Sequence, residues 1–332
     1  MRFIDNRGVT DARVNLALEE HVFRNHPSDD DCLLFYVNAP SIIIGRNQNT
    51  IEEIAPDVVE RRGIRVVRRV SGGGAVYHDL GNLNFSVMTP EVTGRFNRYD
   101  HFTRPVLDVL RDLGVPAELA GRNDIVADGR KISGNAQFAT PTRMFSHGTL
   151  LFDSDLDHVT EALRPRAGKV ESKGVKSIRS RVANISEFLR EPMTVDELRE
   201  RIVERIFGTR DRAAIPTVAL TDRDWDAVHE LVARKYGTWG WNFGENPPSN
   251  VQRAQRFPAG EVDVRMDIQE GRIAAIRIFG DFMGRADVGQ LERRLAGVTH
   301  ESSAIRGALA GLDLRDYFGD VDPDAVIALV EP

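Results

Sequence analysis

Three consecutive glycines, Gly72 to Gly74, stand one residue after the strand-like run 64–70, and they constrain the fold more than any other feature of the chain. Glycines at the end of a strand leave backbone N–H groups uncovered, so that a phosphate or a planar base can approach the main chain. Arg69 adds a guanidinium that can bind a phosphate or a carboxylate through two hydrogen bonds. A phosphate cradle and a tight turn with positive φ both explain the glycines, and the glycines alone do not decide between them.

The glycine-rich segment lacks the spacing of the common nucleotide-binding motifs. No Lys-Ser or Lys-Thr pair follows the glycines, as a P-loop requires, and the pattern G-x-G-x-x-G is absent. The sequence therefore excludes the P-loop and the dinucleotide-binding fold as the basis of any nucleotide site here.

The order of the expected elements predicts an α+β fold in which a large mixed β-sheet is flanked by helices. Apolar spacing predicts helices at residues 10–25, 51–62, 99–113, 194–207 and 222–236, and strands at residues 32–37, 41–45, 64–70, 83–88 and 144–152. The basic stretch 164–184 reads as a surface loop, which either closes over a bound substrate or is simply solvated.

A break rich in Pro and Asn, residues 246–250, marks the expected domain boundary. It separates a large domain, residues 1–245, from a small α/β C-terminal domain, residues 246–332. In the small domain, strands at 261–268 and 272–279 form a hairpin around Glu270-Gly271, and two amphipathic helices follow.

Lys131 lies just beyond a predicted hairpin tip. Asp128-Gly129 stands between two apolar runs and favours a type I′ turn, which needs positive φ at both central residues. A lysine held near a glycine-rich loop can bridge a substrate carboxylate and the phosphate that it attacks, because it neutralises charge in the transition state. The alternative is a solvated hairpin lysine without a role, since most lysines are exposed.

Charge and hydropathy limit the partners of the chain. A net charge of −6 and a pI near 5.8 give no general attraction to nucleic acid or anionic lipid. No apolar run is long enough for a membrane span, and Met1 leads into a polar stretch rather than a signal peptide, so we expect a cytoplasmic protein. The single cysteine, Cys32, lies in an apolar run and is expected in a buried strand.

Two blocks of the sequence resemble the signature segments of lipoate–protein ligases, which are related to biotin–protein ligases and octanoyltransferases. The first is residues 69–81, and the second runs from Gly121-Arg122-Asn123-Asp124 to Lys131-Ile132-Ser133-Gly134. Supporting blocks stand at residues 44–49, 147–150 and 177–184, and the chain from Trp241 onward resembles the small C-terminal domain of the longer members. The resemblance covers the large domain in order and implies a biotin/lipoate ligase-like fold.

The resemblance implies a reaction in two steps. Lipoate and Mg-ATP give lipoyl-AMP and pyrophosphate, and the lipoyl group then passes to a lysine of an apo lipoyl domain. The implied partners are the lipoyl domains of 2-oxoacid dehydrogenase E2 subunits and the glycine cleavage H protein, in the salvage of exogenous lipoate. No protein nucleophile is needed, because such a site aligns a carboxylate with the α-phosphate and screens charge.

The resemblance also assigns residues, with Lys131 as the catalytic group. ATP or the adenylate is expected to contact Arg69, Gly72, Gly73, Gly74, Ala75, Val76, Tyr77, Asn123, Asp124 and Lys131. Lipoate is expected to contact Ser71, His78, Lys131 and His147, and Asp124 is the candidate for orienting Mg²⁺. His78 and His147 are each either a general base for the acceptor lysine or an orienting hydrogen-bond partner.

Three other functions compete with the ligase hypothesis. An octanoyltransferase passes its acyl group through a cysteine thioester and needs an accessible, activated cysteine, which Cys32 is not expected to be. A biotin–protein ligase also makes an acyl-adenylate, but the ordered blocks favour the lipoate type. A protein that binds lipoate without catalysis would be expected to have lost Arg69 or Lys131, and both are present.

Overall fold

The structure, a computed structural model, describes residues 1–26, 29–90, 92–163, 181–244 and 249–332. The chain forms two compact units. Unit 1 comprises Met1–Ile43, Ile51–Arg68 and Val76–Asn242, and unit 2 comprises Ile44–Thr50, Arg69–Ala75 and Phe243–Pro332. Unit 2 therefore includes two loops from the N-terminal part of the chain, and one of them carries the three glycines. The domain limits 1–245 and 246–332 remain a prediction.

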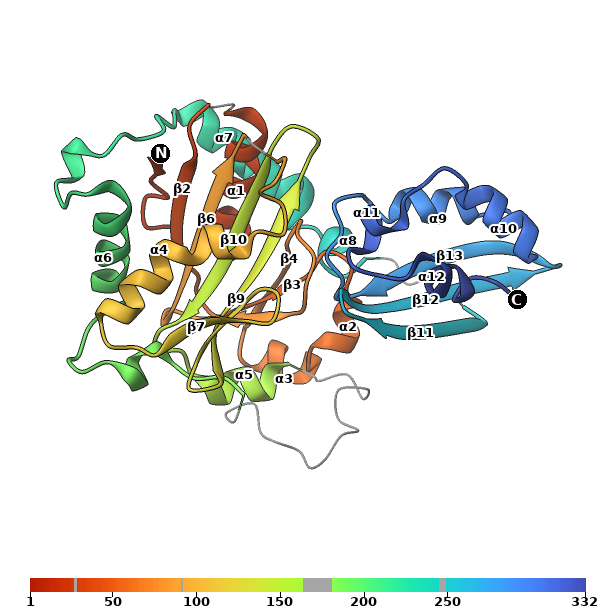
Figure 1. Cartoon of the computed structure of the whole chain (residues 1–332), viewed down its shortest axis with the longest axis horizontal. Coiled ribbons are helices and arrows are strands. Elements are labelled where there is room, and N and C mark those ends of the chain that lie inside the picture. The colour runs from red at the N-terminus through yellow and green to blue at the C-terminus, as the bar shows by residue number, and fades with distance from the viewer. Residues whose placement is uncertain (27–28, 91, 164–180, 245–248) are drawn as a thin grey trace. The chain divides into compact units, whose positions relative to one another are not determined.

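A seven-stranded mixed sheet is the centre of the described part of unit 1 (Figure 1), as the sequence predicts. Its strands, in order across the sheet, are β1 (Arg2–Ile4), β2 (Cys32–Val37), β6 (Asn82–Thr89), β10 (Met144–Leu151), β9 (Arg130–Ala139), β8 (Asp124–Ala127) and β7 (Ala117–Ala120). β1 runs parallel to β2, and the remaining neighbours are antiparallel. Cys32 is buried and free, as expected from its apolar run.

One face of this sheet is apolar and lies under helices α4 (Tyr99–Asp112) and α6 (Val195–Phe207). Alternation along β6 places Leu83, Phe85 and Val87 in the core with these helices. α6 begins with a capping box between Thr194 and Glu197 and ends where Gly208 adopts a φ of 70°. The apolar residues whose spacing predicts both helices are the residues that these helices bury against the sheet.

The opposite face is covered by helix α1 (Ala12–Asn25), whose Phe23 ring packs against Phe138 of β9 and Phe145 of β10. α7 (Asp222–Leu231) packs beside α1 and continues as the π-helical turn η5 (Val232–Tyr236) and the short helix α8 (Trp239–Asn242). A three-stranded sheet, in the order β4 (Arg65–Arg68), β3 (Ser41–Ile44), β5 (Val76–His78), belongs to the same unit apart from Ile44, which is part of unit 2. Short elements complete it: α2 (Thr50–Glu53), α3 (Pro56–Arg61), α5 (Leu156–Ala162), η3 (Ile185–Phe188) and η4 (Arg212–Ala214).

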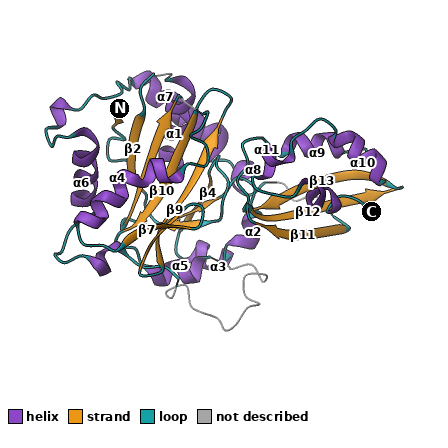
Figure 2. Ribbon diagram, in the orientation of Figure 1, coloured by secondary structure: helices purple, strands orange, loops and turns teal. Residues whose placement is uncertain are grey.

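The C-terminal part of unit 2 is an antiparallel sheet of β11 (Val251–Phe257), β12 (Gly260–Gln269) and β13 (Arg272–Gly280), packed against helices (Figure 2). The helices are α9 (Gly289–Leu295), α10 (Ser302–Leu309), α11 (Leu314–Phe318) and α12 (Pro323–Ala328). Their apolar side chains form one core with those of the strands. The hairpin turn is the predicted one, with Glu270 and Gly271 both at positive φ.

Several elements differ from the sequence prediction. The expected helix 51–62 is two helices, because Pro56 has no N–H to donate and begins α3 instead. Four short helices replace the two expected after β13, and β1, β7 and β11 were not predicted as strands. These strands are short or carry many exposed polar residues, so they lack the apolar alternation of the central strands.

The described residues test two further predictions only in part, namely the basic surface loop and the absence of a membrane-spanning segment. The basic stretch 164–184 lies mostly outside them, since the description resumes at Arg181. Among the described residues, no helix combines the length and the apolarity that crossing a membrane would require.

Candidate functional site

The Lys131 hairpin has the geometry expected from its turn residues. Asp128 and Gly129 have φ of 47° and 73°, which are the positive values of a type I′ turn. Strand β9 then carries Lys131, whose N–H donates to the Arg181 carbonyl at 2.7 Å and whose carbonyl accepts from Ala183 N–H at 2.9 Å. The backbone of Lys131 is thus fixed on two sides, by β8 and by the returning segment around Val182.

The Lys131 side chain lies across Gly134 and pairs with Asp124. Its Nζ is 2.8 Å from Asp124 Oδ1, and the two side chains are 34% and 37% exposed. A Cβ at Gly134 would stand 2.8 Å from Nζ, so the glycine leaves the space that the lysine occupies. An exposed ion pair of this kind adds little stability, and either partner can be exchanged for a ligand at small cost.

Asn123 forms hydrogen bonds with the backbone of the neighbouring strand, β9. Its Nδ2 donates to the Asn135 carbonyl at 2.5 Å, while Asn135 donates to the Asn123 carbonyl from both its backbone N and its Nδ2. These bonds clamp β8 to β9 at the level of Asp124 and Gly134. The predicted role of Asn123 at the phosphates stays a prediction, and in this structure its amide group positions the Asp124 strand.

Strand β5 carries three predicted residues, Val76, Tyr77 and His78. Tyr77 pairs with Ile42 across the ladder, and burial, followed by the charges of Asp79 and Asp155, raises the pKa of its phenol to about 12. The hydroxyl is therefore a neutral donor at any physiological pH. His78 is buried, and Asn38 Nδ2 donates to its Nδ1 at 3.0 Å.

Asn38 in turn accepts a hydrogen bond from Asn15 of α1 at 2.9 Å. The orientation of the His78 ring is thus set by buried amides from two other elements. The two roles that the sequence left open for His78 both stay predictions.

His147 faces a buried carboxylate that the sequence prediction missed. Its Nδ1 is 3.1 Å from both carboxylate oxygens of Glu19, and the side chains are 9% and 2% exposed. Glu19 comes from α1, which covers this face of the sheet. A signal was present in the sequence, because Glu19 and Glu20 stand in a mostly apolar stretch of α1, and every residue from Val14 to Phe23 is buried.

In unit 2 the glycine-rich loop, Arg69–Ala75, runs against the second loop, Ile44–Thr50. Arg69 N–H donates to the Ile44 carbonyl and Arg46 N–H to the Ser71 carbonyl, both at 2.9 Å. The approach is so close that a Cβ at Gly45 would lie 1.8 Å from the Gly73 carbonyl oxygen. The block at residues 44–49 therefore has a structural reason, since it forms the second side of this loop pair.

Arg69 is buried and donates within its own loop. Its Nε donates to Ser71 Oγ at 3.1 Å, and its Nη2 donates to the carbonyls of Gly72 and Gly74 at 2.7 and 2.9 Å. The sequence predicts this guanidinium as a donor to phosphate or carboxylate, and here it shapes the loop. Ser71, predicted to contact lipoate, is likewise buried in the loop.

The three glycines do different things. A Cβ on Gly72 would lie 2.4 Å from the Phe282 carbonyl oxygen, and Gly73 has a φ of 94°, so both positions demand glycine for the fold of the loop. Around Gly74 there is no atom within 4 Å of a Cβ position among the described residues. The turn explanation therefore accounts for Gly72 and Gly73, and the open backbone at Gly74 fits the approach of a ligand.

The structure divides the predicted residues between the two units. Within unit 1 it brings Lys131 and Asp124 into contact, with Asn123 beside them in sequence, and it places His78 and His147 on separate buried partners. Unit 2 holds Arg69, Ser71, Gly72, Gly73, Gly74 and Ala75 in one loop. Each unit thus contains one compact group of the predicted residues.

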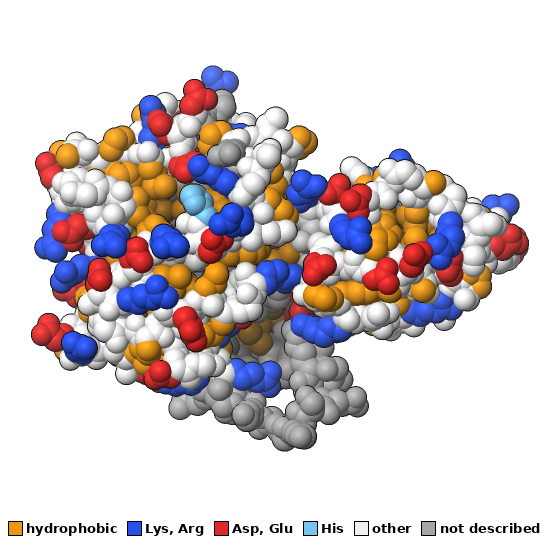
Figure 3. Space-filling view, in the orientation of Figure 1, with side chains coloured by type: hydrophobic (Ala, Val, Ile, Leu, Met, Phe, Trp, Pro, Cys, Tyr) orange, Lys and Arg blue, Asp and Glu red, His pale blue; other side chains and the backbone are white. Residues whose placement is uncertain are grey.

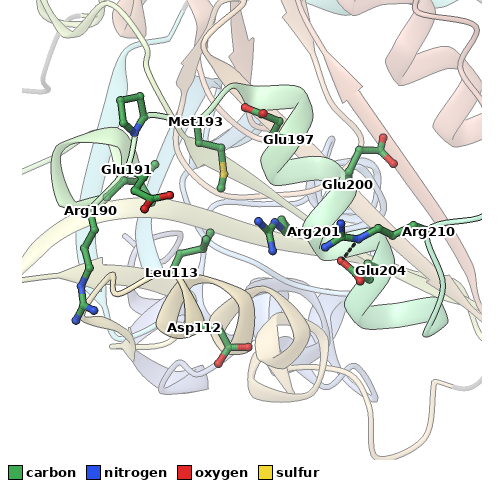
Figure 4. Close-up of a pocket in the computed structure, with 12 residues that line it drawn as sticks. Asp112, Leu113, Arg190, Glu191, Met193, Glu197, Glu200, Arg201, Glu204 and Arg210 are labelled. Atoms are coloured by element: carbon green, nitrogen blue, oxygen red, sulfur yellow. Dashed lines mark ion pairs between the residues drawn. The ribbon is translucent and has the colours of Figure 1, made fainter.

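Two grooves of unit 1 hold none of the predicted residues. One, of about 340 Å³, is lined mainly by apolar side chains between α4, α6 and the sheet, and Figure 3 shows hydrophobic side chains gathered on this side of the unit. The other, of about 520 Å³, lies between the end of α4 and α6. Figure 4 shows it lined by charged side chains of both signs, with Arg210 paired to Glu204. Neither arrangement suggests a site for adenylation.

Comparison with known proteins finds two family matches. The lipoyl protein ligase A/B catalytic domain matches residues 11–207, and the C-terminal domain of bacterial lipoate–protein ligases matches residues 246–330. Lipoate-protein ligase LplJ of Bacillus subtilis is 52% identical over 330 residues, covering 99% of this chain and all of the relative. Lipoate–protein ligase 1 of Staphylococcus aureus is 48% identical over the same shares of both chains.

Solved structures agree on the fold. Plasmodium falciparum LipL1 in complex with lipoate superposes with a TM-score of 0.77 over 99% of this chain and 97% of its own, at 22% identity. A lipoate-protein ligase A bound with ATP gives 0.61 at 31% identity, over 73% of this chain and 98% of its own. A bipartite lipoate protein ligase from Thermoplasma acidophilum, described with its E2 lipoyl domain, gives 0.64 at 31%, over 75% and 98%. Since both of its parts match in order and its relatives align along its whole length, this chain belongs to the lipoate–protein ligase family of enzymes.

Proposed function

We propose that the chain activates lipoate as its adenylate with ATP and transfers the lipoyl group to a lysine of a lipoyl-domain protein. Support comes from relatives named lipoate-protein ligases at 52% and 48% identity, and from a relative of known structure bound with ATP. The observation that carries the proposal is the position of Lys131, whose Nζ lies over Gly134, 2.8 Å from Asp124.

In the first step, a carboxylate oxygen of lipoate attacks the α-phosphorus of ATP, and the bond from that phosphorus to the pyrophosphate oxygen breaks. Negative charge from both reactants meets at this point. We assign the screening of this negative charge to the Lys131 ammonium. The hairpin that carries Lys131 is fixed by hydrogen bonds, and the ammonium can exchange Asp124 for a substrate oxygen. A single preorganised donor of this kind contributes about 3 kcal/mol to the activation step.

We assign the contacts to ATP and the adenylate to the glycine-rich loop and the strand that follows it. Gly74 and Ala75 would present open backbone N–H groups, and Val76 and Tyr77 would continue the contact along β5. Arg69 would keep the loop in shape through the carbonyls of Gly72 and Gly74 and add positive charge beneath it. We also propose Asn123, which stands beside Asp124 in the sequence, as a contact to ATP or the adenylate.

Mg²⁺ bound with ATP neutralises phosphate charge. The residues present fit a site of this kind only in part, because Asp124 offers one partly exposed carboxylate and Lys131 already stands 2.8 Å from it. We therefore propose Asp124 as an orienting ligand, released when Lys131 turns to the substrate, and expect the other ligands to be phosphate oxygens and water.

In the second step, the amine of the acceptor lysine attacks the lipoyl carbonyl carbon, the new amide bond forms, and the bond to the AMP oxygen breaks. The amine gives up a proton in this step. His147, held by Glu19, is our candidate either for receiving this proton or for positioning the lipoyl group. We propose His78 and Ser71 as further contacts of the lipoyl group. The proposed acceptors are lipoyl domains of 2-oxoacid dehydrogenase E2 subunits and the glycine cleavage H protein, and the proposed role is the salvage of exogenous lipoate. Support for an E2 acceptor comes from the Thermoplasma acidophilum relative that is described with its E2 lipoyl domain.

The octanoyltransferase alternative has little support. It needs an exposed thiolate, whereas the single cysteine, Cys32, is 1% exposed and lies in the interior strand β2.

The proposal is tested with purified protein, Mg-ATP, lipoate and an apo lipoyl domain, with pyrophosphate release and the mass of the acceptor as readouts. We expect wild type to add one lipoyl mass and Lys131→Ala to lose at least about 100-fold in rate. The matched control is Arg130→Ala, the neighbouring cation on β9, whose guanidinium pairs with Glu187 at the surface and whose loss should leave the rate within twofold of wild type, about 0.4 kcal/mol. A wild-type protein that binds lipoate but releases no pyrophosphate would favour the non-catalytic alternative.

A further inference from the structure

A cluster of two histidines and one aspartate joins the C-terminal end of α1 to the first turn of α7, apart from every residue assigned above. His21 Nε2 and His26 Nε2 lie 3.1 and 2.8 Å from the same atom, Asp224 Oδ1. The three ligand atoms all lie within 4.8 Å of one another. His26 follows the last helical residue of α1, where the backbone leaves the helical conformation with a φ of −112° and a ψ of 74°.

We propose that His21, His26 and Asp224 bind one Zn²⁺ ion. Zn²⁺ takes imidazole nitrogens and carboxylate oxygens at about 2.0–2.2 Å, usually as a tetrahedron. Ligand atoms in such a tetrahedron lie about 3.3–3.6 Å apart, which follows from the bond length. The two observed distances to Asp224, 3.1 and 2.8 Å, are shorter by roughly 0.2 to 0.8 Å, so side-chain rotations that move the ligand atoms apart admit the ion. Water would complete the coordination.

The burial of the three ligands suits an ion that enters from solvent and is then held. The side chains of His21, Asp224 and His26 are 8%, 18% and 25% exposed, so the site opens on the His26 side. Two of the ligands, Asp224 and His21, are also held by a second group. Asp224 Oδ2 accepts from Thr221 N–H at 2.8 Å and Thr221 Oγ at 2.7 Å, which leaves Oδ1 directed at the histidines.

Asn25 supports His21 in the same way. Its Nδ2 is 3.2 Å from His21 Nδ1, so in the present hydrogen-bonded state Nε2 carries the proton that Asp224 accepts. When Nε2 binds a metal ion, the proton belongs on Nδ1 and needs an acceptor. Turning the Asn25 amide offers its oxygen for this purpose.

The ion would connect two helices that are about 200 residues apart in the sequence, since His21 and Asp224 differ by 203 positions. α1 also carries Glu19, the partner of His147. The inferred role is structural, because a metal crosslink bound only by the folded chain raises its stability through mass action. It does not depend on the adenylation chemistry proposed above.

The test uses the full chain, stripped of metal with a chelator and titrated with ZnCl₂. We expect one zinc per chain after desalting, measured by atomic spectroscopy, and a rise in Tm with added zinc. His26→Ala is the decisive variant, because this side chain is partly exposed and follows the last helical residue of α1. It should weaken zinc binding at least about tenfold and abolish the Tm shift.

His101→Ala is the matched control, since His101 is an exposed histidine of α4 outside the cluster, and it should bind zinc like wild type. His21→Ala should repeat the His26→Ala result, and circular dichroism checks that each variant is folded. Failure of wild type to bind stoichiometric zinc, or retention of that zinc by folded His26→Ala, would overturn the proposal and leave a plain hydrogen-bonded cluster. Lipoyl transfer by His26→Ala, measured separately, should be unchanged, so the two proposals can fail independently.

Discussion

The two faces of the seven-stranded sheet are built differently. Toward α4 and α6, β6 presents Leu83, Phe85 and Val87 to one apolar core. Toward α1, the intervening residues Asn84 and Ser86 are just as buried but polar. Burying polar groups costs free energy unless each finds a partner.

On the α1 side, β10 continues this polar surface with His147 and Thr149, beside Phe145, whose ring packs against Phe23 of α1. His147 meets Glu19 of α1, and Thr149 Oγ accepts from Gly134 N–H, next to the Lys131 site. The comparison teaches that the apolar face provides stability, whereas the polar face provides the oriented groups that a reaction can use.

The largest expected effect is on the apolar face. Phe85→Ala should lower the free energy of unfolding by about 4 kcal/mol, because a buried aromatic ring is lost and a cavity remains. Urea unfolding followed by circular dichroism measures this, with Leu80→Ala as the control, since Leu80 is 61% exposed. If Phe85→Ala cost less than about 1 kcal/mol, this face would not be the stabilising one.

Glu20 tests whether charge on α1 also contributes to stability. It is 6% exposed and binds Lys235 Nζ and Tyr236 OH, each at 2.6 Å. Burial by itself would raise the pKa of its carboxyl, but the bonds and charge of Lys235, then Tyr236 and Arg24, lower it below the ordinary 4.5. Because the pKa is lower in the folded state, the ionised Glu20 carboxylate stabilises the fold above pH 4.5. This stabilisation is lost as the pH falls through the folded-state pKa.

We therefore expect Glu20→Gln to cost about 3 kcal/mol at pH 7, since it leaves the Lys235 ammonium without its buried partner. The difference between variant and wild type should shrink in acid, as urea titrations at pH 7 and pH 3 would reveal. Glu187→Gln, at an exposed pair with Arg130, is the control and should cost under about 1 kcal/mol. A pH-independent difference would contradict the charge explanation.

Glu19 tests the functional side of the comparison. Glu19→Gln keeps the shape of the contact with His147 and removes its charge, which contributes about 1.5 kcal/mol to such a hydrogen bond. We expect the rate of lipoyl transfer to fall about tenfold, while the KM for ATP stays unchanged. Glu118→Gln, on the exposed side of β7, is the control. Equal losses in adenylate formation and in transfer would show that Glu19 acts on lipoate binding rather than on the second step.

Gly134→Ala should have the smallest effect. The new Cβ would stand 2.8 Å from Lys131 Nζ and 2.9 Å from Cε, which are the mobile end of a side chain, so stability should change little. The displaced ammonium should slow pyrophosphate release about fivefold, or about 1 kcal/mol. Gly129→Ala, at the tip of the same hairpin, strains a φ of 73° and should lower stability instead. An unchanged rate in Gly134→Ala would remove the reason for placing Lys131 at the reacting atoms.

Much of the fold was predictable from the sequence. The amphipathic spacing of α4 and α6 and the alternation along β6 follow from the burial of the face that they share. Errors occurred where local signals are weak or compete, as at Pro56, which divides one expected helix, and in the exposed edge strand β11. Periodicity detects one-sided burial, so short or largely exposed strands escape it.

By itself the sequence determined where Lys131 stands, because the turn at Asp128 and Gly129 depends only on neighbouring residues that accept positive φ. Only the tertiary structure decided what the candidate residues touch. It paired His147 with Glu19, 128 positions away, and turned Arg69 onto the carbonyls of its own loop. Backbone conformation is set by near neighbours, whereas side-chain partners depend on strand register and helix placement, which arise when distant segments pack together.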